Sequence, residues 1–172
     1  FMRSVPMVII LFVSYYSTPL IIQTYLASIG LSADVSAVPA AAYAIAAFVL
    51  EQAAYSSEVF RSAILAVDKG QIEAAQSVGM TKPVAYVRVV LPQAITSALP
   101  NLNGLFVGLV QGTSLAYFVG VYEVMATSTL LANASYAYIE AYLMATVIYE
   151  VLSFVFNRIF RVIEGRASRY LN

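Results

Sequence analysis

Long stretches without a charged residue are the feature that most restricts what this chain can fold into. Residues 4–33 contain no charge, and neither do residues 89–122. An α-helix rises about 1.5 Å per residue, so about twenty apolar residues cross a bilayer core of about 30 Å. Composition agrees, since 61% of the 172 residues are hydrophobic and only 10% are charged. The sequence therefore predicts an all-α, polytopic transmembrane helical bundle.

Four membrane spans are predicted along the chain. They cover residues 5–26, residues 35–59, part of residues 94–121, and residues 138–160. Pro19 is expected to bend the first span. Residues 124–137 are also apolar, but their hydroxyl and amide side chains favour an amphipathic external connector over a further span.

The basic residues are distributed unevenly among the predicted connections. The loops near Asp34 and around Glu123 contain no Lys or Arg. The basic residues lie before the first span, between the second and third, and after the fourth: Arg3; Arg61, Lys69, Lys82 and Arg88; Arg158, Arg161, Arg166 and Arg169. Since Lys and Arg favour the cytoplasmic side, both ends and the central loop are predicted to be cytoplasmic. The arginines of the tail are expected to anchor at anionic headgroups.

A polar segment between the second and third spans predicts a short helix. Asp68 can cap its first turn, which is expected to carry Glu73, and Gly79 lies where a left-handed C-terminal cap would end it. Its apolar residues are Ile72, Ala75 and Val78. A helix this short is marginal in water, so it is expected to dock on a second chain. On these grounds alone, an ordinary cytoplasmic loop with a helical turn remains the alternative.

The same segment carries a spaced motif. Glu73-Ala74-Ala75 is followed by Gly79, then by Val89 and Leu91-Pro92. This pattern resembles the EAA loop of the membrane subunits of ATP-binding-cassette (ABC) importers, with valine where the family has isoleucine. In that family the loop forms a coupling helix that seats in a groove of the ATPase subunit. The resemblance implies such a helix over residues 71–78, with these ATPase-coupling residues: Gln71, Glu73, Ala74, Ala75, Val78, Gly79, Leu91 and Pro92.

Further segments extend the likeness over nearly the whole chain. They are Phe1-Met2-Arg3-Ser4-Val5-Pro6, the A-Y-x-x-E-x-x-R pattern of residues 54–61, Lys69-Gly70-Gln71, Leu91-Pro92-Gln93-Ala94 and Thr113-Ser114-Leu115. They resemble the polar amino acid uptake subfamily of ABC permeases, of the His/Gln/cystine type. Members have five spans with the N-terminus outside. The resemblance therefore implies one type I importer transmembrane domain over residues 1–172 that lacks the first span.

Polar residues inside predicted spans are costly and are therefore functional candidates. The candidate substrate-pathway residues are Glu51, Glu58, Asn101, Asn103, Gln111, Thr113 and Ser114. A structural ion pair between Glu58 and Arg61, three residues apart on a helix, is the alternative for Glu58. Bends near Pro92 and Pro100 are expected to make a discontinuous helix that lines the pathway. A face of small residues, Gly104, Gly108 and Gly112, predicts close packing of another helix.

The resemblance also bears on the substrate. In family members with a site inside the membrane, a K-D pair precedes T-S-L, and Gln111 and Gly112 occupy these positions here. A neutral amide replaces the cation and glycine replaces the carboxylate. A zwitterionic or neutral substrate, such as the sulfur-containing amino acid cystine, therefore fits better than a cationic one.

These features predict the permease subunit of an ATP-driven amino-acid importer in the bacterial inner membrane. The sequence contains no G-x-x-x-x-G-K-[ST] loop, so a partner ATPase is expected to bind ATP and magnesium. The other expected partners are a second permease subunit, identical or not, an extracytoplasmic solute-binding protein and membrane lipid; nucleic acid is not expected. An ion-coupled transporter or channel with Glu51 and Glu150 as relays is the alternative. An intramembrane enzyme or metal site is disfavoured, because the chain has no His or Cys and its two Asp lie in connecting segments.

Overall fold

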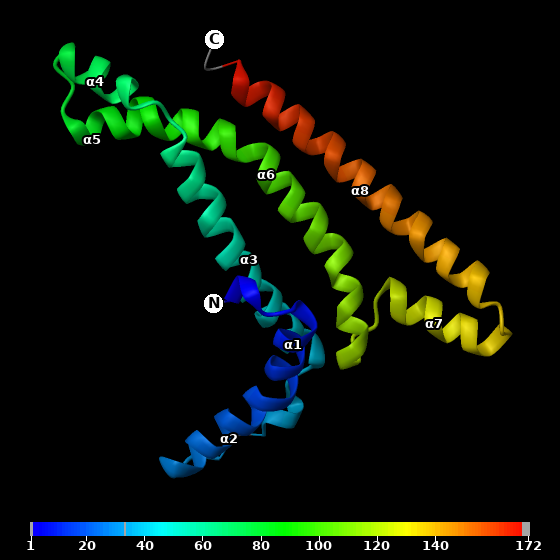
Figure 1. Cartoon of the computed structure of the whole chain (residues 1–172). Coiled ribbons are helices and arrows are strands. Elements are labelled where there is room, and N and C mark those ends of the chain that lie inside the picture. The colour runs from blue at the N-terminus through cyan, green and yellow to red at the C-terminus, as the bar shows by residue number, and fades with distance from the viewer. Residues whose placement is uncertain (1, 33, 170–172) are drawn as a thin grey trace. The chain divides into compact units, whose positions relative to one another are not determined.

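The computed structural model describes residues 2–32 and 34–169, and its regular elements in that part of the chain are all helices (Figure 1). The predicted all-α fold is therefore confirmed. The chain divides into two compact units. The first comprises Phe1–Ala54 and Leu109–Leu152, and the second comprises Tyr55–Gly108 and Ser153–Asn172.

Two long helices contain a wide π-helical turn just before a proline. In the first, the π turn η2 (Val13–Ser17) joins α1 (Met7–Phe12) to α2 (Thr18–Ser28), which holds Pro19. In the second, η4 (Tyr86–Val90) joins α5 (Lys82–Ala85) to α6 (Leu91–Gly112), which holds Pro92. Proline has no N–H for the carbonyl four residues back. The preceding turn widens instead, and the N–H groups of Thr18 and Leu91 bond carbonyls five residues back.

Three helices in the described part of the chain are long and apolar enough to cross a membrane: Met7–Ser28, Lys82–Val119 and Tyr138–Ser168. The last is α8. The predicted second span forms α3 (Ala40–Leu65), whose 26 residues suffice in length, but it is not among the three. Glu51 and Glu58 interrupt its apolar surface, so the count of four spans stays a prediction.

The predicted external connector forms α7 (Val124–Ser135). Its 12 residues extend about 18 Å, which is too short to cross a bilayer core. Its two sides are not cleanly amphipathic, because Ser128 is buried while Leu130 and Leu131 are 53% and 61% exposed. The segment is therefore a short helix that connects two longer ones, without a clear polar side, and its place outside the membrane stays a prediction.

The core of the first unit is built around η5 (Thr113–Val119), a 3₁₀ helix that continues α6. Small side chains let its neighbours approach closely. The buried cluster consists of Ile10 and Leu11 from α1, Ala44 and Ala47 from α3, and Ala116 and Val119 from η5. Ser14 also donates a 2.8 Å hydrogen bond to the carbonyl of Tyr43, which ties the first helix to α3.

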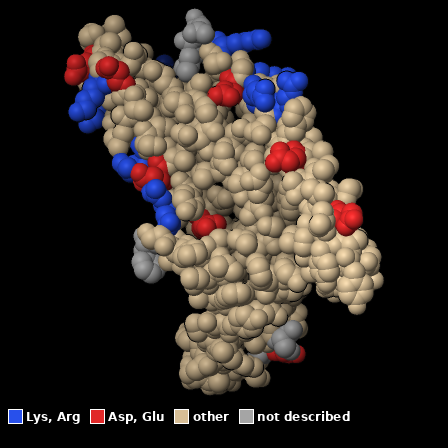
Figure 2. Space-filling view, turned by 45° about the vertical axis from the view of Figure 1, so that its right-hand side comes forward, with Lys and Arg blue, Asp and Glu red and all other residues tan. Residues whose placement is uncertain are grey.

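The second unit has a smaller core between α3 and α6. Ala63 packs with Ala94 and Ala98, and larger side chains surround them. The short helix α4 (Lys69–Ser77) contacts α5 and η4, at the start of the long helix that continues into α6. Outside these cores, the surface in Figure 2 is mostly uncharged, as expected of helices whose solvent is lipid.

The structure bears on two predictions about the third predicted span. The helix is not interrupted at Pro92 or Pro100 but remains helical from Lys82 to Val119, tightening to a 3₁₀ helix at Thr113. The π turn η4 before Pro92 compensates for the hydrogen bond that proline cannot make, so the helix continues without a break. A Cβ added at Gly104, Gly108 or Gly112 would meet no atom within 4 Å, so no described helix of this chain packs closely on them.

Candidate functional site

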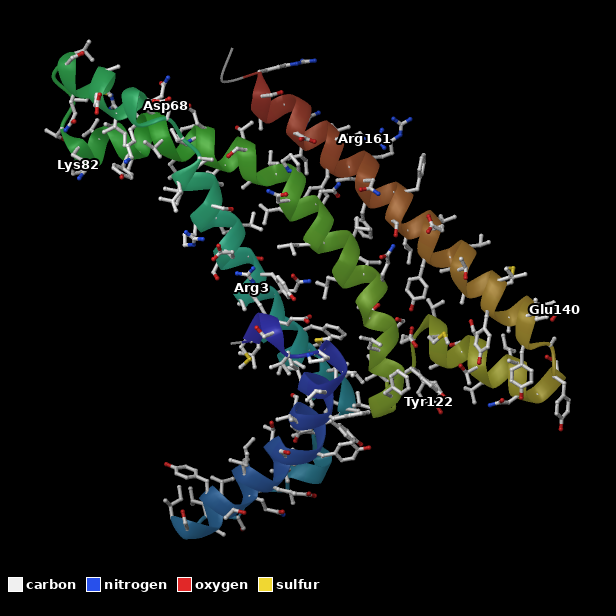
Figure 3. The ribbon with its side chains drawn as sticks, in the orientation of Figure 1. Arg3, Asp68, Lys82, Tyr122, Glu140 and Arg161 are labelled. Atoms are coloured by element: carbon white, nitrogen blue, oxygen red, sulfur yellow. The ribbon has the colours of Figure 1, made fainter. Side chains whose placement is uncertain are left out.

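The N-terminus of α4 is capped as predicted. Asp68 Oδ1 accepts a 2.6 Å hydrogen bond from the backbone N–H of Gly70. Figure 3 labels Asp68 at the start of this helix and Lys82 at the start of α5. Glu73 was predicted in the first turn, and this is wrong, because the helix begins at Lys69 and Glu73 falls in the second turn. The favourable interaction with the helix dipole, which fades within the first turn, is therefore weak for Glu73.

Gly79 closes the C-terminus of α4 two residues after Ser77, as the predicted left-handed cap. Gly79 has a φ of 88°, in the left-handed region that glycine enters without strain. Its N–H donates to the carbonyl of Gln76 at 3.0 Å, and the N–H of Met80 donates to the carbonyl of Ala75 at 3.1 Å. These two bonds form a Schellman motif, which satisfies the last carbonyls of the helix.

Between these caps, α4 exposes most of its side chains. Ala75 is buried and Ile72 is half-buried, but Val78 is 74% exposed. The candidate coupling residues Gln71, Glu73 and Ala74 are exposed as well, and so are Leu91 and Pro92 at the start of α6. Val78 therefore does not help to bury α4 within its unit, and its apolar side chain is left exposed.

A polar cleft of about 470 Å³ lies between the start of α4 and α6. It is lined by Ala66, Val67, Asp68, Gln71, Gln93, Thr96 and Ser97. The Gln93 side-chain amide donates a long, 3.5 Å hydrogen bond to the Gln71 side chain across this cleft. One candidate coupling residue is therefore linked directly to the helix predicted to line the pathway.

The candidate pathway residue Glu58 pairs with Arg61 on α3. Arg61 Nε donates to Glu58 Oε2 at 3.0 Å, and a guanidinium nitrogen contacts the other carboxylate oxygen. This is the i,i+3 ion pair that was the alternative for Glu58. The other acidic candidate, Glu51, is half-buried on the same helix.

Asn103 forms an interhelical contact that its sequence position did not reveal. Its side-chain nitrogen donates a 2.8 Å hydrogen bond to the side-chain oxygen of Asn157 on α8. The Asn103 oxygen is buried without a hydrogen-bond partner in the structure. Phe106 packs nearby against two α8 rings, with ring centroids 4.8 Å from Phe156 and 5.6 Å from Phe160. Sequence reasoning missed Asn157, although an amide within an apolar run was an available signal.

The other candidates of this region form local bonds or face outward. Thr113 and Ser114 donate to the carbonyls of Val110 and Gln111, three residues back, at 2.6 Å and 2.8 Å. The side chains of Asn101 and Gln111 are exposed. Among the described residues, no three His, Cys, Asp or Glu side chains gather as metal ligands.

A second missed pair joins α7 to α8. Glu123 accepts hydrogen bonds from the N–H groups of Met125 and Ala126, both at 2.7 Å, and so caps α7. The Tyr149 hydroxyl donates a third hydrogen bond to Glu123, also at 2.7 Å. Thr113, a candidate pathway residue, lies beside the same hydroxyl. The sequence showed Glu123 only as a connector residue, because its partner is 26 positions away.

Three long apolar helices in the described part of the chain define the class as a polytopic membrane protein. Residues 1–169 match the family model described as binding-protein-dependent transport system inner membrane component. The chain belongs to this family, which makes it an integral membrane component of a transport system.

Relatives and a solved structure agree with this assignment. The chain is 38% identical to the probable amino-acid permease protein YxeN of Bacillus subtilis, over 98% of this chain and 71% of that protein. It is 32% identical to the L-cystine transport system permease protein TcyL of the same organism, over 98% of this chain and 68% of that protein. A crystal structure of an amino acid ABC transporter with histidines superposes with a TM-score of 0.78 and 28% identity, covering 96% of this chain and 71% of that one.

Proposed function

We propose that this chain is the permease subunit of an ATP-driven importer for an amino acid. Its family and the amino-acid permeases among its relatives support this function. The structural observation that carries the proposal is α4, which is capped at both ends yet exposes Gln71, Ala74 and Val78. Such a helix is suited to seat in a groove of another protein.

In this proposal α4 is the coupling helix, and a separate ATPase binds ATP and magnesium. Glu73, Ala74 and Ala75 lie in the middle of α4, and the Gly79 cap fixes its end. Two contacts can carry a displacement of α4 into the membrane helix. One is the packing of α4 on η4, which is continuous with α6, and the other is the Gln71–Gln93 contact. Leu91 and Pro92 lie where these helical segments join.

The remaining parts of the importer follow from this role. We expect α4 and the C-terminus to face the cytoplasm, where an ATPase operates, which agrees with the basic residues of the central loop and tail. A second permease subunit would complete the pathway, and an extracytoplasmic solute-binding protein would deliver the substrate. Asn101, Gln111, Thr113 and Ser114 remain pathway candidates, with the hydroxyls of Thr113 and Ser114 donating to carbonyls three residues back.

For the substrate, we propose a zwitterionic or neutral amino acid. Gln111 offers an exposed amide, and Gly112 next to it has no side chain. Neither supplies the charge that would select a cationic or anionic side group. One relative is named for L-cystine, which agrees with this class.

Uptake into proteoliposomes tests the function directly. The chain is reconstituted with its co-purifying subunits, and uptake of labelled amino acids is measured with ATP inside the vesicles and no ion gradient. Uptake that requires ATP supports the proposal. Uptake that follows an imposed proton gradient without ATP would instead support the ion-coupled alternative, with Glu51 and Glu150 as relays.

A further inference from the structure

An apolar groove runs between α7 and α8, within the first unit. Its volume is about 570 Å³. Its walls come from Val124, Thr127, Ser128, Leu131 and Ser135 on α7, from Ala137 in the turn, and from Glu140, Ala141, Met144 and Ile148 on α8. On each helix these positions recur every three to four residues, so each helix contributes one face. Leu131 and Met144 are each 61% exposed, which shows that the chain itself leaves this groove open.

The groove has the length of one bilayer leaflet. Its α7 wall extends from Val124 to Ser135, and the eleven residue steps between them rise about 16 Å. Half of the hydrocarbon core is about 15 Å thick. At the end of the groove lined by Val124 and Ile148, the hydrogen bond between Glu123 and Tyr149 joins α7 to α8. A single extended acyl chain therefore matches the groove in length and polarity.

The other end of the groove has the features of a membrane interface. Tyr136, Tyr138 and Tyr142 lie at the turn between the two helices and are 83%, 42% and 36% exposed. Tyrosine is enriched at the headgroup level of membranes. Glu140, labelled near this turn in Figure 3, lines the groove at the same end. The apolar wall therefore begins at headgroup depth and extends into the hydrocarbon.

The charged residues near the groove indicate which lipid headgroup can bind at its interfacial end. Residues 89–157 contain Glu123, Glu140 and Glu150 but no Lys or Arg. A phospholipid with net negative charge would find no cation here and would face the Glu140 carboxylate. A headgroup that ends in a primary ammonium can donate a charge-assisted hydrogen bond to that carboxylate.

We propose that this groove binds a diacyl phospholipid with a primary ammonium headgroup, such as phosphatidylethanolamine. One acyl chain lies between α7 and α8, and the ammonium group binds Glu140. A bound lipid would fill the space between the two helices and hold them as one hairpin. This site is independent of ATP coupling, so it can be tested apart from the proposed function.

Native mass spectrometry of the purified full chain tests the site. The detergent-solubilised protein is titrated with phosphatidylethanolamine, phosphatidylcholine and phosphatidylglycerol that carry identical acyl chains. We expect the tightest binding for phosphatidylethanolamine and a Kd about tenfold higher in Glu140→Gln, because one charge-assisted bond is lost. Glu150→Gln, on the same helix but outside the groove, is the matched control and should bind as the wild type does.

A second pair of variants tests the acyl chain. Met144→Trp fills the groove and should abolish binding of every lipid, whereas Leu143→Trp, outside the groove, should not. If Met144→Trp fails to fold, Ala141→Leu serves the same purpose. Equal binding of the three lipids, or equal effects of Glu140→Gln and Glu150→Gln, would overturn the proposal. A photo-crosslinker at position 144 that captures a protein chain in native membranes, rather than lipid, would overturn it as well.

Discussion

The side chain of Asn103 on α6 donates a 2.8 Å hydrogen bond to Asn157 on α8, 54 residues further along the chain. Both residues lie in helices that are long and apolar enough to cross a membrane. An amide without a hydrogen-bond partner is costly in hydrocarbon, so the bond between the two asparagines lowers the free-energy cost of placing each of them there. This pairing makes Asn103 a structural contact between two helices, in addition to its candidacy for the pathway.

The first prediction concerns the strength of this pair. Asn157→Leu leaves the Asn103 amide without its acceptor and should lower the thermal midpoint of the solubilised protein. Double-mutant cycles with Asn103→Leu should give a coupling energy of about 0.6 kcal/mol and no more than about 1.7 kcal/mol, the average and the maximum found for bonds between membrane helices. Asn101→Leu, at an exposed position of the same helix, is the control. A coupling energy of zero, together with altered substrate selectivity, would assign Asn103 to the pathway instead.

The second prediction concerns the end of α4. Gly79→Leu places a side chain at a φ of 88°, which costs an L-residue about 1–2 kcal/mol. No atom lies within 4 Å of the added Cβ, so the effect arises from the backbone and not from a clash. We expect ATP-driven uptake and stimulation of the ATPase to fall at least about fivefold, while the spans stay folded.

Two variants separate backbone strain from other effects at Gly79. Gly79→Asn should retain much of the activity, because asparagine enters the left-handed region more readily. Gly104→Ala adds a methyl group to a regular part of α6 where nothing lies within 4 Å, and it should leave activity unchanged. Wild-type ATPase stimulation in Gly79→Leu would remove the coupling role from the end of this helix.

The caps of α4 were predictable because they depend on neighbouring residues only. Asp68 bonds a residue two positions away, and the Gly79 turn closes within the last residues of the helix. Glu73 was misplaced because its role depended on the residue at which the helix begins. The contacts of Asn157 and Tyr149 could not be predicted from the sequence, because their partners are 54 and 26 positions away and are determined by how the helices pack.

The prolines show a different limit of sequence reasoning. Pro92 and Pro100 suggested a broken helix, but a lost hydrogen bond can be met by widening one turn. The π turns before Pro19 and Pro92 do this, and the N–H groups of Thr18 and Leu91 bond carbonyls five residues back. Whether a proline breaks a membrane helix or widens it depends on the neighbours that hold both sides in place.

The third prediction concerns substrate selection at Gln111. Gln111→Ala removes an exposed amide from the end of α6 and should raise the KM for a zwitterionic amino acid about tenfold, as expected for loss of one good hydrogen bond. Thr24→Ala is the control, because this exposed hydroxyl lies outside the candidate pathway and donates to the carbonyl of Leu20 within its own helix. Unchanged uptake kinetics for all amino acids tested in Gln111→Ala would exclude this side chain from the site.

The fourth prediction concerns the bond between Tyr149 and Glu123. Tyr149→Phe removes one hydrogen bond to a carboxylate that also caps α7, so unfolding should cost about 1.5–3 kcal/mol less. Glu123→Ala removes the cap as well and should destabilise the protein further, by about 1 kcal/mol. Thermal unfolding measures both variants, with Tyr25→Phe at a 64% exposed position as the control. If Tyr149→Phe and Tyr25→Phe unfold at the same temperature, this bond does not hold α7 to α8. The hairpin would then depend on side-chain packing and on whatever occupies its groove.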